Sequence, residues 1–168
     1  GLSLLLEAMA DKRIKAAGIR LLVAGEFYEE SQPYLDQIKN LDITDTVILK
    51  TEFIPDSQVR NYLCAADLVV QPYKHATQSG VTPLAYHFEK PMVVTRVGGL
   101  PEIVDHGKSG YVVDVSPAAV AESILDFFEN GREAAFREGV RAESLRFSWS
   151  YMVQTIKKIY EESAAAGR

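Results

Sequence analysis

The residues best suited to hold a phosphorylated ligand lie between positions 74 and 81. Thr77 and Ser79 provide hydroxyl donors, and Gly80 lets the backbone approach a ligand closely. Lys74 and His75 can add positive charge. The stretch leads into a predicted helix over about 80–89, whose first N–H groups have no partner inside the helix. We therefore expect an anion such as a phosphate to bind there.

A second interpretation of the same residues is purely structural. Ser79 can cap the helix, or Thr82 and Pro83 can form its N-cap and first helical residue. Capping patterns have low specificity, so the stretch by itself leaves both interpretations open.

Two further loops follow apolar runs in the same way. Gly98 and Gly99 precede a short helical turn, and their bare amides can face the same ligand or simply form a turn. The loop 51–55 follows the apolar run 46–50. Ligands of doubly wound sheets bind at the carboxyl ends of the strands, so these loops are expected to meet there.

The apolar pattern of the chain predicts a frame that brings these strand ends together. Five short β-branched runs alternate with helical stretches at about 31–41, 56–66 and 80–89; the runs lie at 20–25, 46–50, 67–73, 91–96 and 110–115. Near-continuous apolar runs are typical of strands buried on both faces. The alternation predicts an α/β fold with a Rossmann-like, doubly wound parallel sheet.

Helices are predicted at both ends of the chain. An apolar stripe at helical spacing opens it, formed by Leu2, Leu5, Leu6 and Met9. Ser116 and Pro117 are expected to begin a helix that ends before Gly131. Helices at 132–146 and 150–163 then form a helical C-terminal tail. The apolar stripe of the last helix is expected to pack into the core rather than to bind a partner; it comprises Tyr151, Met152, Ile156, Ile159 and Tyr160.

Length and charge exclude several classes of protein. The chain has 168 residues, enough for one domain with its own core. It has 18 Lys and Arg against 23 Asp and Glu, a net charge of −5, which disfavours nucleic acid as a partner. No apolar run approaches the roughly 18 residues that a membrane span needs, and the first residues do not resemble a secretory signal.

The sequence also lacks several common motifs. No G-x-G-x-x-G follows a strand and no G-x-x-x-x-G-K-[ST] is present, which disfavours dinucleotide enzymes and P-loop NTPases. The histidines His75, His87 and His106 do not have metal-ligand spacing, so no metal site is expected. A single cysteine, Cys64, cannot form an internal disulfide and favours a cytoplasmic location.

Several segments are informative when they are taken together. They are GLSLLLEAM, LLVAG, FIPDSQVRNYLCAADLVVQPY, KPMVVTRVGGLPEIVDHGKSGYVV and FSWSYMVQTIKKIY. From Gly1 to about Tyr160 the chain resembles the C-terminal, nucleotide-sugar-binding half of retaining GT-B glycosyltransferases of family 4, the glycosyl transferases group 1. The resemblance implies that residues 1–168 form one donor-binding domain and that the N-terminal acceptor domain is absent from this chain. It also implies a UDP-, GDP- or ADP-sugar donor, bound without a metal or other cofactor.

The resemblance assigns site residues by position. The loop of Glu52, Phe53 and Ile54 would contact the base through backbone groups. The diphosphate would bind at the helix start formed by Thr77, Gln78, Ser79, Gly80 and Val81. Gly98 and Gly99 would border the same pocket. These assignments coincide with the loops chosen from their residue types, whereas the resemblance assigns no catalytic residue here.

The chain departs from the family at three places. Ala76 and Leu84 stand where two glutamates are usual, which leaves Gln78 as the nearest side chain able to contact a sugar hydroxyl. Two phosphate-clamping basic residues of the family would precede Gly1. Glu89 stands where a helix-ending glycine is usual, and a left-handed conformation there would cost ~1 kcal/mol.

The favoured function is therefore sugar transfer from a nucleotide to a saccharide or lipid-linked acceptor, as in polysaccharide biosynthesis. The enzyme would be cytoplasmic or attached peripherally at the inner face of the membrane, and the present chain alone would be inactive. One alternative is a non-catalytic sugar-nucleotide-binding or scaffold domain. The other is a nucleotide-sugar epimerase, for which Glu102 and His106 are the only candidate acid or base residues in the cleft.

One element of the family's sheet would also precede Gly1. In the strand order 3-2-1-4-5-6 it is the first strand, which lies at the centre of the sheet. Its absence leaves the runs 21–25 and 68–72 with unpaired backbone groups. We expect these two runs to pair directly and close the gap.

Overall fold

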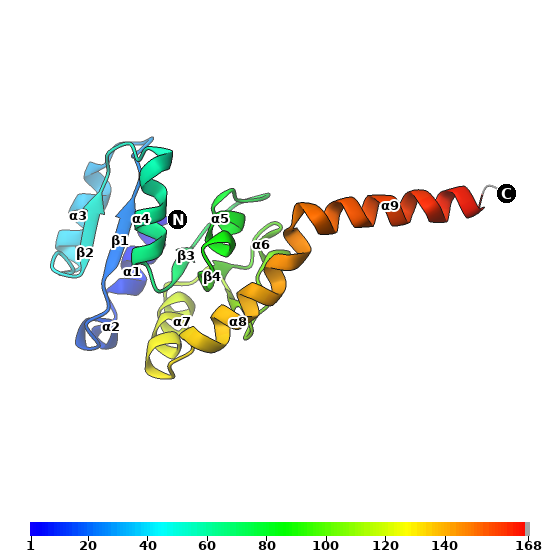
Figure 1. Ribbon diagram of the computed structural model, residues 1–168. Coiled ribbons are helices and arrows are strands. Elements are labelled where there is room, and N and C mark those ends of the chain that lie inside the picture. The colour runs from blue at the N-terminus through cyan, green and yellow to red at the C-terminus, as the bar shows by residue number, and fades with distance from the viewer. Residues whose placement is uncertain (167–168) are drawn as a thin grey trace.

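The computed structural model describes residues 1–166, apart from the side chains of residue 146 and residues 164–166. Strands and helices alternate along it (Figure 1). The strands are β1 (Leu21–Ala24), β2 (Val47–Lys50), β3 (Val69–Gln71), β4 (Met92–Thr95) and β5 (Gly110–Val113). The helices are α1 (Leu2–Met9), α2 (Lys12–Ala16), α3 (Gln32–Asn40), α4 (Asp56–Ala65), α5 (Val81–His87), α6 (Leu100–Ile103), α7 (Pro117–Glu129), α8 (Glu133–Ser144) and α9 (Trp149–Ala166), with a 3-10 turn η1 (Leu145–Phe147) before α9. The predicted α/β class is confirmed.

All strand pairs are parallel, but the strands form two sheets rather than one. β1 pairs with β2, with Leu21 beside Val47. The second sheet has the order β3-β4-β5, with Met92 beside both Val69 and Gly110. Within residues 1–166 no pairing joins β1 to β3. The expected direct closure of the runs 21–25 and 68–72 is therefore wrong.

The packing of α1 connects the two halves of the fold. This helix contacts α3, which follows β1, and also α7, which packs on β4 and β5. Leu6 and Met9 of α1 are buried in one core with Val93 of β4 and Phe127 of α7. The two sheets are therefore connected through a shared helical core rather than through strand pairing.

The strands of the two sheets differ in how deeply their residues are buried. Every residue of β4 and β5 is buried, as expected for strands covered on both faces. In β1, by contrast, Leu22 and Ala24 are exposed while Leu21 and Val23 are half-buried. The expectation of full burial fails for β1, whose edge toward β3 has no neighbouring strand among residues 1–166.

The helix ends follow the local signals closely. Ser116 and Pro117 begin α7, and Gly131 follows it with a φ of 58°, so both predictions are confirmed. The alternative N-cap at Thr82 with Pro83 is wrong, because α5 begins at Val81 with Gly80 at its N-cap.

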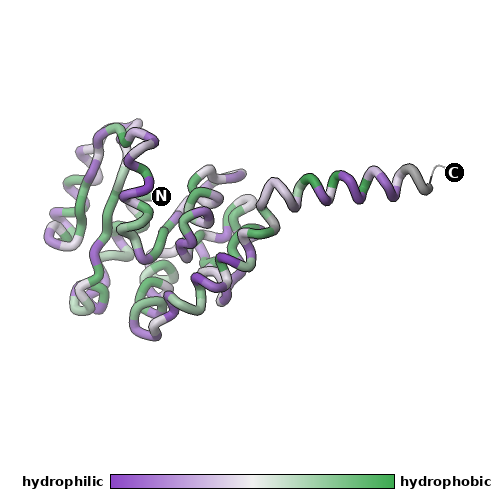
Figure 2. Tube along the Cα trace, in the orientation of Figure 1, coloured by the Kyte–Doolittle hydropathy of each residue, from purple (hydrophilic) through white to green (hydrophobic). Residues whose placement is uncertain are grey.

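The last helix contradicts the expectation of core packing. α9 extends away from the rest of the molecule, and hydrophobic and hydrophilic residues alternate along it (Figures 1 and 2). Its apolar stripe is exposed, with Ile156 at 58% and Tyr160 at 75%. The helical period predicts an apolar face but not what covers that face, and η1 directs the chain away from the core.

Glu89 has a φ of 54°. This is the left-handed conformation expected at a position where a helix-ending glycine is usual. Its carboxylate forms an ion pair with Arg141, whose Nη2 lies 2.9 Å from Glu89 Oε2. The hydrogen bond and charge of Arg141 hold the pKa of Glu89 below its usual value. Glu89 thus provides a contact to α8 that glycine would lack.

Gly139 provides a test of how α8 packs. A Cβ at this position would lie 2.1 Å from the carbonyl oxygen of Lys108. Alanine normally stabilises a helix interior by about 1 kcal/mol relative to glycine. We expect Gly139→Ala to lower the melting temperature instead, because α8 would have to move away from the turn at 108–109. Ala135→Gly, at an exposed position of α8, is the control and should lose only helix propensity. A melting temperature for Gly139→Ala equal to or above that of the parent would contradict this packing.

Candidate functional site

A buried side chain at the end of β3 organises the candidate anion-binding loop. Gln71 is 2% exposed. Its Nε2 donates to Ser79 Oγ at 2.8 Å, and its Oε1 accepts from Thr82 Oγ1 at 2.8 Å. Ser79 Oγ also accepts from the backbone N–H of Val81 at 3.2 Å. Gln71 therefore attaches both the loop and the first turn of α5 to the sheet.

The loop is fixed from a second direction by β4. Thr95, at the end of that strand, donates from Oγ1 to the carbonyl oxygen of Tyr73 at 2.5 Å. The Tyr73 hydroxyl lies 3.3 Å from Ser79 Oγ. These buried contacts are satisfied, so they stiffen the loop at little cost in unpaired polar groups.

Gly98 and Gly99 lie directly against this loop. The Gly99 N–H donates to the carbonyl oxygen of Thr77 at 2.9 Å. Gly98 has a φ of 52°, and a Cβ there would lie 1.8 Å from the carbonyl oxygen of Ala76. Only glycine allows this approach, so the structure brings together two of the three predicted loops.

The third predicted loop lines a groove that includes the two ends of the anion loop but not residues 74–80, Gly98 or Gly99. Phe53 and Ile54 line this groove, as do Tyr73 and Val81, and its volume is about 720 Å³. Phe53 is 70% exposed. Glu52 is exposed beside them but does not line the groove.

The predicted diphosphate residues are accessible to different degrees. Thr77, Gln78 and Gly80 are exposed, whereas Ser79 is half-buried because its hydroxyl is used inside the protein. In the described part of the chain, the backbone N–H groups of Gln78, Ser79 and Gly80 donate no hydrogen bond. Exposed N–H groups that are not paired within the protein are suited to an oxyanion.

The charges around the site have both signs. Lys74 and His75 are exposed on the loop after β3, and Glu26 and Glu29 are exposed on the loop after β1. Ala76 and Leu84 place no carboxylate there, and Leu84, 37% exposed, instead lines the groove with an apolar side chain. Lys74 is a cation within the anion loop itself.

Glu102 and His106 lie elsewhere, in a separate hollow of about 290 Å³. His106 accepts the backbone N–H of Val112 through Nδ1 at 3.0 Å. This bond ties the ring to β5 and gives His106 a structural role. The geometry does not favour an epimerase.

Sequence reasoning missed Gln71. The available signal was a polar residue at the end of an otherwise apolar run, directly before Pro72. Such a residue needs buried partners, and the hydroxyls of Ser79 and Thr82 supply them.

Comparisons with known proteins show the family and the fold of the chain. The family model for glycosyl transferases group 1 matches residues 1–130. The chain belongs to this family. It is 32% identical over 131 residues to a D-inositol 3-phosphate glycosyltransferase of Acidothermus cellulolyticus, covering 77% of this chain and 29% of that protein.

Solved structures show the same fold. One is the C-terminal domain of a glycosyl transferase group 1 family protein of Francisella tularensis, with a TM-score of 0.75, 16% identity and coverage of 85% of this chain and 76% of that one. Another is HepE of Anabaena in complex with UDP, with a TM-score of 0.77, 22% identity and coverage of 95% of this chain and 44% of that one. HepE was also solved with UDP-glucose. This group 1 chain thus has the fold of GT-B C-terminal domains, and it spans less than a third of the Acidothermus protein and less than half of HepE.

Two kinds of feature, a membrane-spanning helix and a metal-binding cluster, were sought among the described residues. Within residues 1–166, no helix has the length and apolarity to cross a membrane. The same part of the chain contains no cluster of three or more potential metal-binding side chains of the His, Cys, Asp or Glu type.

The contact at Gly98 predicts a specific loss of stability. We expect Gly98→Ala to lower the melting temperature more than Gly107→Ala. Both glycines have positive φ, but a Cβ at Gly107 meets nothing within 4 Å, whereas at Gly98 it meets the Ala76 carbonyl. The control therefore measures backbone strain alone, about 1 kcal/mol. Equal losses in the two variants would show that the two loops do not pack as described.

Proposed function

We propose that this chain is the donor-binding part of a glycosyltransferase that uses a nucleotide diphosphate sugar. The observation that carries the proposal is the group of unpaired N–H donors at Gln78, Ser79 and Gly80, held in place by Gln71 and Gly98. These donors lie at the carboxyl end of β3, where ligands of doubly wound sheets bind. The UDP complexes of HepE, a structural neighbour, support a nucleotide as the ligand.

The proposed role of the loop is electrostatic. When a sugar leaves its nucleotide, negative charge develops on the departing diphosphate. N–H groups fixed by the Gln71 and Thr95 contacts can stabilise this charge without transferring a proton. We assign the diphosphate to residues 77–81, the base to the loop of Glu52, Phe53 and Ile54, and no metal or other cofactor to this step.

The same proposal covers the donor, the stereochemistry of transfer, the acceptor and the location of the protein. The donor is a UDP-, GDP- or ADP-sugar, transfer retains the anomeric configuration, and the acceptor is a saccharide or lipid-linked sugar bound by a separate N-terminal domain. We place the protein in the cytoplasm, in keeping with its exposed free thiol at Cys64.

One observation favours a second candidate, a domain that binds sugar nucleotides without catalysis. Ala76 and Leu84 offer the donor no carboxylate. Both candidates predict nucleotide binding, and they differ in whether the protein joined to its acceptor domain transfers sugar.

Gly80 offers a test of the diphosphate site. Its φ is −66°, and a Cβ there meets nothing within 4 Å, so Gly80→Val should fold normally. The valine side chain would cover the N–H groups that we assign to the diphosphate. We expect at least a tenfold loss of UDP affinity in titration calorimetry, with Ala134→Val, at an exposed position of α8, as the control. Unchanged affinity in folded Gly80→Val would place the diphosphate elsewhere.

The division of the activity between two domains gives another test. The chain alone is expected to bind a nucleoside diphosphate in calorimetry but to release no sugar product from UDP-glucose, GDP-mannose or ADP-glucose. Binding without turnover is expected because the acceptor side of the cleft is not built by these residues. Steady turnover by the chain alone would contradict this division.

A further inference from the structure

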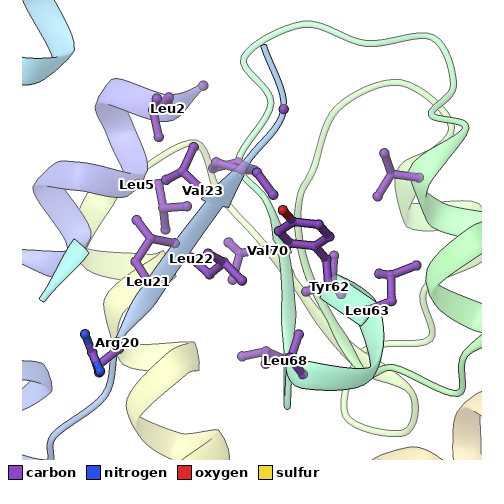
Figure 3. A pocket seen from close by; sticks show the side chains of 18 of the residues that line it. Leu2, Leu5, Arg20, Leu21, Leu22, Val23, Tyr62, Leu63, Leu68 and Val70 are labelled. Atoms are coloured by element: carbon purple, nitrogen blue, oxygen red, sulfur yellow. The ribbon is translucent and has the colours of Figure 1, made fainter. Parts of the chain in front are cut away.

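The groove of about 720 Å³ that adjoins the anion loop ends at two aromatic side chains. Along β1 and β3 its walls are apolar: Figure 3 shows Leu22 of β1, Tyr62 of α4 and Val70 of β3 directed toward the same space. The lining continues past the carboxyl ends of the strands to Tyr28 and Phe53. The two rings therefore lie at the edge of the fold where ligands of doubly wound sheets bind.

Tyr28 and Phe53 occupy equivalent places on neighbouring loops. β1 and β2 are parallel and pair as far as Ala24 and Lys50. The N–H of Gly25 then donates to the carbonyl oxygen of Lys50 at 2.9 Å, which holds the starts of the two loops together. Tyr28 lies three residues beyond Gly25, and Phe53 lies three residues beyond Lys50. The paired strands thus bring both rings to the same part of the groove.

The loop after β1 is anchored by one aromatic residue and presents the next one to solvent. Phe27 stacks on Tyr34 of α3, with ring centroids 5.4 Å apart and an angle of 16° between the planes. Tyr28 is 97% exposed, and within residues 1–166 its ring packs on no other ring. Phe27 therefore attaches the loop to α3 while the face of the Tyr28 ring stays accessible at the groove.

An accessible aromatic face beside a groove is suited to a flat, aromatic ligand. Aromatic rings stack on one another in offset arrangements, and a nucleobase offers such a ring. Base–aromatic stacking is tolerant of sequence, because every base has a π-face. Tyr28 and Phe53, both largely exposed, can supply this contact without any hydrogen bond to the base.

We propose that Tyr28 stacks on the base of the donor nucleotide, beside Phe53. This inference rests on the proposed function, which assigns the base to the loop of Glu52, Phe53 and Ile54. It adds a second loop to the base site, the one after β1, and it states how that loop recognises the base. Since stacking depends on the π-face that all bases share, Tyr28 contributes affinity for UDP and GDP alike and does not choose between them.

The contribution of Tyr28 can be separated from that of the diphosphate site. The anion loop follows β3 and is held by the hydrogen bond of Gln71 to Ser79 and by the close contact of Gly98 with Ala76. Tyr28 belongs to the loop after β1 and takes no part in these contacts. Inorganic pyrophosphate has no base, so its binding reports on the anion loop alone.

Titration calorimetry of the chain with UDP, GDP and inorganic pyrophosphate tests the proposal. We expect Tyr28→Ala to weaken binding of UDP and of GDP about tenfold and to leave pyrophosphate binding unchanged. Tyr28→Phe keeps the ring and should retain the affinity for both nucleotides. The matched control is Tyr160→Ala, which removes a ring that is 75% exposed on α9 and should change none of the three affinities.

Three results would overturn the proposal. Equal UDP affinities of Tyr28→Ala and the parent chain would show that the ring does not contact the base. Equal losses of UDP and pyrophosphate affinity would show that the substitution disturbs the anion loop instead. Binding of pyrophosphate by the parent chain as tightly as UDP would show that the base is not held, although the diphosphate site stands. A parent chain that binds neither ligand would refute the proposed function itself, and the role of Tyr28 with it.

Discussion

The hydrogen bonds of Gln71 are the constraint on which the candidate site depends. A primary amide buried at the end of β3 needs partners for both its donor and its acceptor, and the hydroxyls of Ser79 and Thr82 supply them. Meeting that need holds the loop at 77–80 against the sheet and uses Ser79 within the protein. The backbone N–H groups of Gln78, Ser79 and Gly80 stay available, so the loop offers main-chain rather than hydroxyl donors at its centre.

The same loop depends on a close backbone contact with the next strand connection. Gly98, at positive φ, lets the chain after β4 pass within contact distance of Ala76 and donate from Gly99 to Thr77. The connections after β3 and β4 are thus held together by a hydrogen bond and a close backbone contact. Within residues 1–166, no hydrogen bond of this kind joins the loops after β1 and β2 to these two connections. The two sheets are separate and are connected through α1 and α7.

Local signals in the sequence were sufficient to predict α7 and the strands. Ser116 with Pro117, Gly131, and the β-branched runs located α7 and the strands within a few residues, because these signals act through nearby backbone geometry. The stripe of α9 and the pairing of β1 with β3 were predicted wrongly, because both depend on what lies next to an apolar surface. The role of Gln71 was missed for the same reason, since its partners are eight and eleven residues away.

Titration of the isotopically labelled chain with UDP, followed by amide chemical shifts, tests the central claim most directly. The account predicts saturable shifts at Gln78, Ser79 and Gly80, accompanied by Gly98 and Gly99 and by the loop of Phe53 and Ile54. Shifts confined to the hollow around Glu102 and His106, or no saturable shift at the amides of residues 77–81, would contradict it.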